Sequence, residues 1–192
     1  MNKAPLFCIL GQSGAGKTSI CTAIEHDLNM KQIPSYTTRP PRFEGEPGHT
    51  FVTDAEYAKL KDILAENTTT GYKYCVTKEQ IEGDYDLYVV DFSGLKMLRS
   101  KYHGEREIVS IYIFAPLKER YERLWTRYME IYDDSARACE EALNRIVSDT
   151  KEFDGCSTQC RYVVNNYDDE LYRAIERVKE IIVNEVSNCN AF

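Results

Sequence analysis

The chain has 192 residues, a formal net charge of −7, 43% hydrophobic residues and 29% charged residues. These values match a single globular domain and exclude a disordered chain, a collagen-like chain or a coiled-coil rod. General nucleic-acid binding needs a basic surface, so no nucleic-acid partner is expected for this acidic chain.

Neither a signal peptide nor a membrane span is expected. Only five consecutive apolar residues precede Gly11, which is too short for a signal-peptide core, and no apolar run reaches the length of a membrane span. We therefore expect a cytoplasmic protein without a membrane partner. The seven cysteines are an odd number and lack C-x-x-C spacing, which indicates reduced thiols. The alternative is that Cys156 and Cys160 form half of a metal site, although the three histidines are scattered.

Short apolar runs alternate along the chain with amphipathic segments. The predicted strands cover residues 6–10, 87–90, 108–114 and 161–164. The predicted helices cover residues 18–29, 55–64, 117–131, 135–153 and 171–182. A hairpin is predicted at residues 68–76, and the proline- and glycine-rich residues 34–50 are expected to be irregular and functional. The alternation of strands and helices predicts a three-layer α/β fold with a parallel sheet.

Residues 11–18 match the pattern G-x-x-x-x-G-K-[ST] between a predicted strand and a predicted helix. Glycines let backbone N–H groups wrap around phosphate oxygens, and the following helix adds the partial positive charge of its N-terminus. The lysine supplies a cation to the β- and γ-phosphates, and the threonine hydroxyl can hold Mg²⁺. We therefore predict a nucleoside triphosphate site made by Gly11, Gln12, Ser13, Gly14, Ala15, Gly16, Lys17 and Thr18.

Two further features indicate a second ligand beside this loop. Asp91 ends the apolar strand 87–90, at the edge of the sheet where ligands bind, so it could hold Mg²⁺ through water or bind part of a substrate. Arg39 and Arg42 lie in a proline-rich segment, and the guanidinium group matches phosphate oxygens two at a time. This pair predicts a second phosphate site.

Several segments together resemble guanylate kinases over nearly the whole chain. They are GQSGAGKTS from Gly11, SYTTRPPR from Ser35, HTFV from His49, Gly71-Tyr-Lys-Tyr74, VVDFSG from Val89, Arg123-Leu124 with Arg127, Arg145-Ile146 with Glu152, and Val163-Val164-Asn165. The resemblance implies a P-loop kinase fold with a core of residues 1–33, 87–122 and 158–192, a GMP-binding lobe of residues 34–86 and a lid of residues 123–157.

The resemblance also implies an activity: phosphoryl transfer from ATP to GMP or dGMP with Mg²⁺, by a monomer or a homodimer. Guanine presents two neighbouring N–H donors, which a carboxylate such as Glu66 can accept together. The acceptor nucleotide would be bound by Ser35, Arg39, Arg42, His49, Glu66, Tyr74, Val76, Thr77 and Asp91. Asn165 would lie near the adenine, and the catalytic cations would be Lys17, Arg39, Arg123, Arg127 and Arg145.

The chain departs from the family pattern at several positions. His49 stands where tyrosine is usual, Cys75-Val76 replaces Gly-[ST] so that Thr77 could substitute, and the lid is longer. These departures suggest a divergent bacterial or phage-type member. Two alternatives therefore stay open: a related kinase acting on another (deoxy)nucleotide or a ribose bisphosphate, and a non-catalytic interaction domain.

Overall fold

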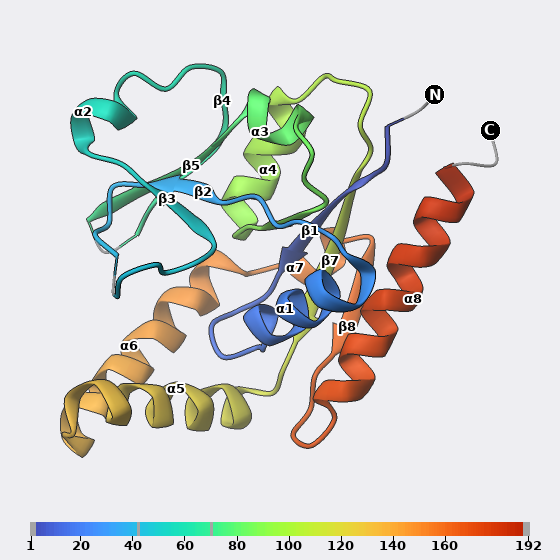
Figure 1. Ribbon diagram of the computed structural model, residues 1–192. Helices are drawn as coiled ribbons and strands as arrows, with labels where there is room; N and C mark the ends of the chain where they lie inside the picture. Colours follow the sequence, from blue (N-terminus) through green and yellow to red (C-terminus); the bar gives the residue numbers. More distant parts are fainter. Residues whose placement is uncertain (1–2, 42, 70, 190–192) are drawn as a thin grey trace.

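The structure is a computed structural model that describes residues 3–41, 43–69 and 71–189. Its centre is a four-stranded sheet in the order β6-β1-β7-β8, with every neighbouring pair parallel (Figure 1). The strands are β1 (Leu6–Leu10), β6 (Leu87–Val89), β7 (Ile108–Phe114) and β8 (Tyr162–Asn165). All four lie within one residue of the positions that the apolar runs predict.

Helices cover both faces of this sheet, as the alternating pattern predicts. Alternate residues of the fully buried strand β1 pack to opposite sides, Phe7 and Ile9 to one and Leu6, Cys8 and Leu10 to the other. The Phe7 side is covered by α1 (Lys17–Leu28) and α8 (Leu171–Cys189). The Leu6 side is covered by α4 (Phe92–Lys101) and α7 (Cys156–Gln159). The result is the predicted three-layer α/β core.

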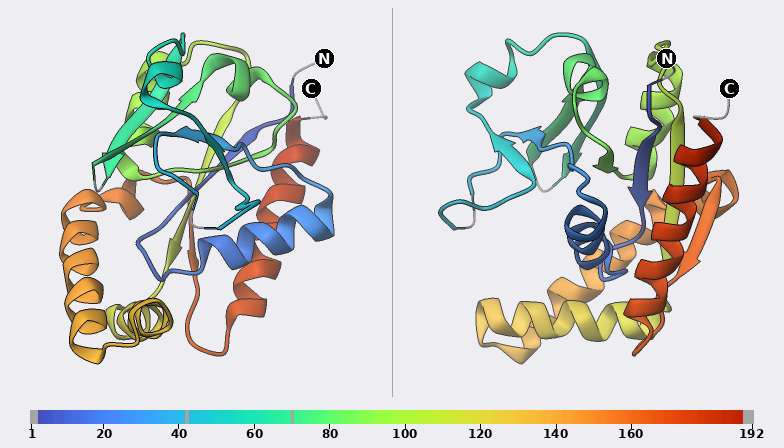
Figure 2. Two further views of the ribbon diagram at one scale, coloured as in Figure 1. Left: turned by 60° about the vertical axis from the view of Figure 1, so that its left-hand side comes forward. Right: turned by 45° about the vertical axis from the view of Figure 1, so that its right-hand side comes forward.

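A second sheet, in the order β3-β2-β5-β4, lies apart from the first. Its strands are β2 (Ser35–Thr37), β3 (His49–Phe51), β4 (Ile63–Thr69) and β5 (Tyr72–Thr77), with the short helices α2 (Asp54–Tyr57) and α3 (Lys78–Glu82) beside them. An antiparallel helical hairpin follows β7 and consists of α5 (Leu117–Tyr132) and α6 (Ser135–Glu152). The second sheet and this hairpin project from the same side of the core (Figures 1 and 2).

The sequence-based prediction of a helix over residues 55–64 is wrong. Helix α2 ends at Tyr57, and Ile63 already begins strand β4. Strand β4 pairs antiparallel with β5 along its whole length, so long-range pairing overrides the local pattern. The segment 34–50 is also less irregular than expected, because β2 and β3 pair in parallel across it. Helices α3 and α4 were not foreseen.

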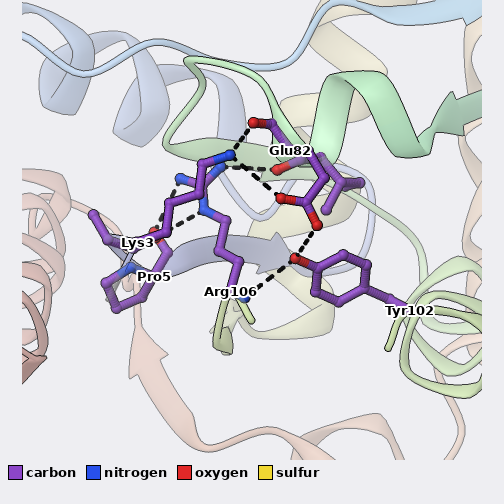
Figure 3. A network of polar contacts seen from close by, with 7 residues as sticks. Lys3, Pro5, Glu82, Tyr102 and Arg106 are labelled. Carbon is purple, nitrogen blue, oxygen red and sulfur yellow. Dashed lines mark hydrogen bonds and ion pairs between the residues drawn. The ribbon is translucent and has the colours of Figure 1, made fainter. Parts of the chain in front are cut away.

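A network of polar contacts fixes the end of the core that lies away from the glycine-rich loop (Figure 3). The buried Arg106 guanidinium donates to the carbonyl oxygens of Ala4, Pro5 and Ile81. The Tyr102 hydroxyl donates to Glu82 at 2.7 Å, and Lys3 contacts the same glutamate. Because these groups surround the start of β1, whereas the loop follows its end, this network is structural.

The described part of the chain has neither a membrane-spanning helix nor a cluster of metal-binding side chains. No helix there is long and apolar enough to cross a membrane. No group of three or more histidine, cysteine, aspartate or glutamate side chains there could hold a metal ion. All seven cysteines are free, and the Sγ atoms of Cys156 and Cys160 are 3.9 Å apart. The hypothesis of a half metal site at these two cysteines therefore gains no support.

Candidate active site

The loop of residues 11–18 connects β1 to α1 and needs glycine for two reasons. Gly14 has a φ of 79°, and a Cβ there would lie 2.8 Å from the Arg120 carbonyl oxygen. Gly16 has a φ of 91° and caps the N-terminus of α1. Other residues would be strained at these angles, and a side chain at Gly14 would push helix α5 away from the loop. The lid hairpin therefore packs directly on the loop.

Lys17 turns its ammonium back into the loop. Its Nζ donates to the carbonyl oxygen of Gly11 at 2.5 Å and to that of Gln12 at 3.2 Å. Burial lowers the pKa of Lys17 to about 8, while the nearby carboxylate of Asp149 opposes this shift. The lysine is therefore already desolvated at the position where a phosphate would bind.

A carboxylate from the lid also reaches the loop. Asp149 of α6 is almost fully buried and accepts a hydrogen bond from the Ser13 backbone N–H. Its other oxygen lies 3.3 Å from Nε of Arg145, and that nitrogen donates to the Ser13 hydroxyl at 2.6 Å. The loop therefore already holds an anion of its own chain, together with one of the predicted catalytic arginines.

Arg120 of α5 is a buried cation next to the same carboxylate. The residue is 5% exposed, and its Nε and Nη1 atoms have no hydrogen-bond partner within the described residues. Burial lowers the pKa of Arg120, and Asp149 is the leading charged group that counteracts the shift. The two side chains are therefore charge partners without a direct hydrogen bond.

Helix α5 and strand β8 hold the loop from outside. Arg123 donates to the Gly14 carbonyl at 3.1 Å and forms ion pairs with Glu119 and Asp168. The buried Asn166 side chain donates to the Ala15 carbonyl at 2.8 Å. Asn165, which was predicted to lie near the adenine, is exposed at the end of β8, and its neighbour Asn166 makes the loop contact.

Two other predicted residues lie at the surface. Arg127 is exposed on α5, yet it is close enough to Lys17 to affect the electrostatics of its ammonium. Thr18 is exposed in the first turn of α1. A cavity of about 250 Å³ opens near this turn, lined in part by Gly16, Arg123 and Asn166.

In the second sheet, Arg39 is held tightly by its surroundings. Its Nη1 and Nη2 atoms donate to the two carboxylate oxygens of Glu46 at 3.1 and 2.8 Å, and Nη1 also donates to the Pro40 carbonyl. Its Nε donates to the Tyr74 hydroxyl at 3.2 Å, and the Phe51 ring lies 5.4 Å away. Within the described residues, four of the five guanidinium N–H groups have a partner and one on Nη2 has none.

Other predicted acceptor residues gather around this arginine. The His49 ring packs edge-on against the Tyr74 ring, with centroids 5.7 Å apart, and its Nδ1 lies 3.0 Å from the Ser35 hydroxyl. Ser35, Arg39, His49 and Tyr74 are thus brought together on one sheet. Arg42 was predicted to belong to the same group, but it lies outside the described residues.

The structure does not bring Glu66 to this group. Glu66 pairs with Cys75, whereas its neighbour Asn67 pairs with Tyr74. Asn67 and Tyr74 therefore lie on one face of the sheet, and Glu66 lies on the other. Glu66 is exposed on the opposite face, near Tyr57. The residue of β4 that faces the predicted site is therefore Asn67, which donates to Asp91.

Asp91 joins the second sheet to the core. It caps the N-terminus of α4 by accepting from the Gly94 N–H at 2.7 Å and from the Ser93 hydroxyl at 3.0 Å with one oxygen. Its other oxygen accepts from Asn67. Both oxygens of Asp91 thus accept hydrogen bonds from the protein itself, where the second sheet meets the core.

The side chains of Val76 and Thr77 are both engaged within the fold, although Val76 lies on the same face of β5 as Tyr74. Val76 is completely buried in the core. Thr77 caps helix α3 by accepting from the Gln80 N–H, in a capping box with the Gln80 side chain. A hydroxyl committed to a cap is not free to replace the missing serine or threonine.

Five residues in or next to these groups were missed by the sequence analysis. The signal for Asp149 was its spacing of four residues from Arg145 on one helix, and the signal for Asn166 was its place after a predicted strand. The missed residues are Glu46, Asn67, Arg120, Asp149 and Asn166.

A parallel sheet whose first strand runs into a lysine-bearing anion loop, with an inserted lobe and a helical lid, defines a P-loop kinase fold. No family model matches the chain. It is 31% identical over 191 residues to a guanylate kinase of Methylobacillus flagellatus, covering 94% of this chain and 89% of that protein. It is 30% identical to a guanylate kinase of Caldanaerobacter subterraneus, covering 94% and 87%. The chain therefore belongs to the guanylate kinase family.

A solved structure has the same fold. The crystal structure of guanylate kinase from Anaplasma phagocytophilum superimposes with a TM-score of 0.62 at 19% sequence identity. The match covers 97% of this chain and 88% of that one. The predicted fold class is thereby confirmed.

Proposed function

We propose that this chain is an enzyme that transfers the γ-phosphoryl group of ATP to GMP or dGMP. The observation that supports this proposal is that one chain of the guanylate kinase family carries two separate clusters of cationic side chains. One is the loop of residues 11–18 with Lys17, and the other is the cluster around Arg39. A kinase of this kind needs two nucleotides in line and neutralised charge between them.

On the donor side, Lys17 and Arg145 supply the cations. Lys17 now donates to carbonyl oxygens of its own loop, and we infer that its ammonium turns to the β- and γ-phosphates when ATP binds. Arg145 already lies on the Ser13 hydroxyl and can reach the phosphoryl group as it transfers. The exposed Arg127 would complete this charge as the lid closes over both nucleotides and excludes water.

The chain offers one side chain that suits a magnesium ion at the donor loop. The Thr18 hydroxyl is exposed in the first turn of α1, where it could hold Mg²⁺ together with phosphate oxygens. The ion would neutralise charge on the transferring phosphoryl group. Asp91 would contribute only after losing its contacts to Asn67 and Gly94.

On the acceptor side, we assign the phosphate to the remaining Nη2 N–H of Arg39, the Tyr74 hydroxyl and His49. Glu46 positions the Arg39 fork rather than binding nucleotide. We assign the guanine edge to Asp91 with Asn67, because Glu66 lies on the opposite face of β4. A carboxylate can accept both N–H donors of that edge, as the sequence analysis proposed for Glu66.

The test is an ADP-release assay with ATP and each ribo- and deoxyribonucleoside monophosphate, followed by chromatography of the products. We expect GDP or dGDP from GMP or dGMP and at least a hundredfold slower reaction with the other acceptors. Release of ADP with another monophosphate or a ribose bisphosphate, and none with GMP or dGMP, would refute the assignment. A cytoplasmic location and a monomeric or homodimeric state stay predictions from the sequence.

A further inference from the structure

We propose that Asp149 is a determinant of donor-nucleotide affinity: its carboxylate occupies an anion position of the phosphate-binding loop and must leave it when ATP or ADP binds. This inference rests on the proposed use of the loop for the donor nucleotide. It concerns a residue of the lid that lies 136 positions along the chain from the loop it contacts.

The first argument is the chemistry of the contact. A phosphate-binding loop presents backbone N–H groups and the positive end of a helix to an anion. In this structure the Ser13 N–H donates to a carboxylate oxygen of Asp149, and Arg145 contacts both Asp149 and Ser13. A phosphate oxygen needs the same donors, so the carboxylate and the nucleotide compete for them.

The second argument is the charge around Asp149. The residue is 3% exposed, and a carboxylate buried to that extent needs compensating cations. Arg145 lies 3.3 Å from its carboxylate. Lys17 and Arg120 are also near, because the charge of Asp149 raises the pKa of each of these two against the lowering effect of burial. These cations belong to three different elements, α6, α1 and α5.

The third argument is the state of Arg120. Its Nε and Nη1 atoms have no hydrogen-bond partner within the described residues, although the side chain is buried. An apolar side chain would avoid this cost at the position. A guanidinium there is explained if it stabilises the Asp149 carboxylate at the loop by charge alone. Arg120 thus acts as a positioning residue for Asp149.

The functional consequence is a lower affinity for the donor and its product. If the carboxylate occupies the loop most of the time, the apparent dissociation constant for ADP equals the intrinsic constant divided by the fraction of molecules whose loop is free. Return of Asp149 to the loop would then favour the release of ADP. Removal of the carboxylate should tighten ADP binding about tenfold, which corresponds to a site that is free about a tenth of the time.

The experiment is calorimetric titration of the full-length chain with ADP and Mg²⁺. The wild type is compared with Asp149→Asn, and with the double variant Arg120→Leu plus Asp149→Ala, which removes both members of the buried charge pair. The double variant guards against misfolding, because replacing both partners with apolar groups is often tolerated. Asp154→Asn, an exposed aspartate just beyond α6, is the matched control.

We expect the ADP dissociation constant to fall about tenfold in Asp149→Asn and in the double variant, with the control unchanged. A dissociation constant that is unchanged or higher in both folded variants would overturn the proposal and leave Asp149 with a structural role only. Phosphorylation of GMP by the wild type is measured separately, so that failure of the proposed function is distinguished from failure of this inference.

Discussion

The two cationic clusters to which we assign the nucleotides have similar chemistry but different connections. At the phosphate-binding loop, Lys17 and the Ser13 N–H lie next to the carboxylate of Asp149, which the hairpin α5–α6 supplies together with Arg145. In the second sheet, Arg39 is paired with a carboxylate only seven residues away, Glu46 of the same loop. Each site therefore contains an anion supplied by the protein itself.

The difference lies in what can separate the two partners. A shift of the hairpin relative to the core can take Asp149 away from Ser13, because the contact is between two bodies of the fold. No movement of the second sheet as a body separates Arg39 from Glu46. A carboxylate on a separate element can compete with a ligand, whereas one in the same loop fixes the geometry of its arginine. Opposite effects of removing the two carboxylates follow from this comparison.

The largest effect is expected from Lys17→Met. Its ammonium is the desolvated cation of the loop, so its loss removes charge compensation in the transition state. We expect kcat to fall about a thousandfold or more, while GMP binding, measured by calorimetry, changes less than about threefold. Lys118→Met, at an exposed lysine of α5, is the control and should match the wild type. Activity within a few fold of wild type in Lys17→Met would exclude this loop as the donor site.

The second prediction compares Asp91→Asn with Glu66→Gln. Asp91 faces the acceptor site with Asn67, whereas Glu66 lies on the opposite face of β4. The first substitution should weaken GMP binding about tenfold to a hundredfold, because a buried acceptor is mismatched at a cost of about 1–3 kcal/mol. The second should change it less than about twofold. Dissociation constants from GMP titrations decide this point. A strong effect of Glu66→Gln alone would restore the sequence-based assignment.

The third prediction concerns Glu46→Gln. Its carboxylate holds the buried Arg39 fork through two hydrogen bonds, so an amide would leave the guanidinium misaligned. We expect the KM for GMP to rise about tenfold and the free energy of unfolding to fall by about 2 kcal/mol. Steady-state kinetics and urea unfolding measure the two effects, with Glu44→Gln at an exposed neighbour as the control. A lower KM for GMP would mean that Glu46 competes with the acceptor phosphate, as Asp149 does with the donor.

The smallest effect is a pH dependence at the loop. Burial lowers the pKa of Lys17 from 10.5 to about 8. The charge of Asp149 opposes this shift, whereas Arg145 and Arg127 add to it. The neighbouring thiol of Cys21 has a pKa that burial raises to about 12. The charged lysine binds phosphate, so kcat/KM for ATP should fall severalfold as pH rises through about 8. Stability should change in the other direction. Between pH 8 and 10.5 the unfolded chain keeps the proton of Lys17, whereas the folded chain has lost it. The free energy of unfolding should therefore rise with pH across this range.

Lys17→Arg provides the comparison for this pH dependence, because arginine keeps its charge throughout the range. Its kcat/KM should be lower overall but flat between pH 7 and 9 within about twofold. An equal fall in the wild type and in Lys17→Arg would assign the titration to another group.

The local motif allowed the donor loop to be predicted from the sequence. Gly11, Gly16 and Lys17 lie within one short segment of the chain, so their spacing alone predicts the loop and the helix after it. The strands of the core were predicted for a similar reason, because each is a continuous apolar run. Features that depend on residues close together in the chain could thus be predicted from the sequence.

Features that depend on strand register and on packing between distant segments could not be predicted from the sequence. Glu66 and Asn67 are adjacent, and a shift of one residue in pairing moves a side chain to the other face of the sheet, so no pattern in the sequence favoured one over the other. Asp149 reads as part of a charged helix surface until the hairpin is docked on the loop. The roles of these residues could be assigned only from contacts between distant segments.

The most direct test of the comparison is to titrate Asp149→Asn and Glu46→Gln side by side, each with ADP plus Mg²⁺ and, separately, with GMP. The account predicts tighter ADP binding with unchanged GMP binding in Asp149→Asn, and weaker GMP binding with unchanged ADP binding in Glu46→Gln. The same direction of change for both variants, each at its own site, would contradict the distinction between a competing and a positioning carboxylate.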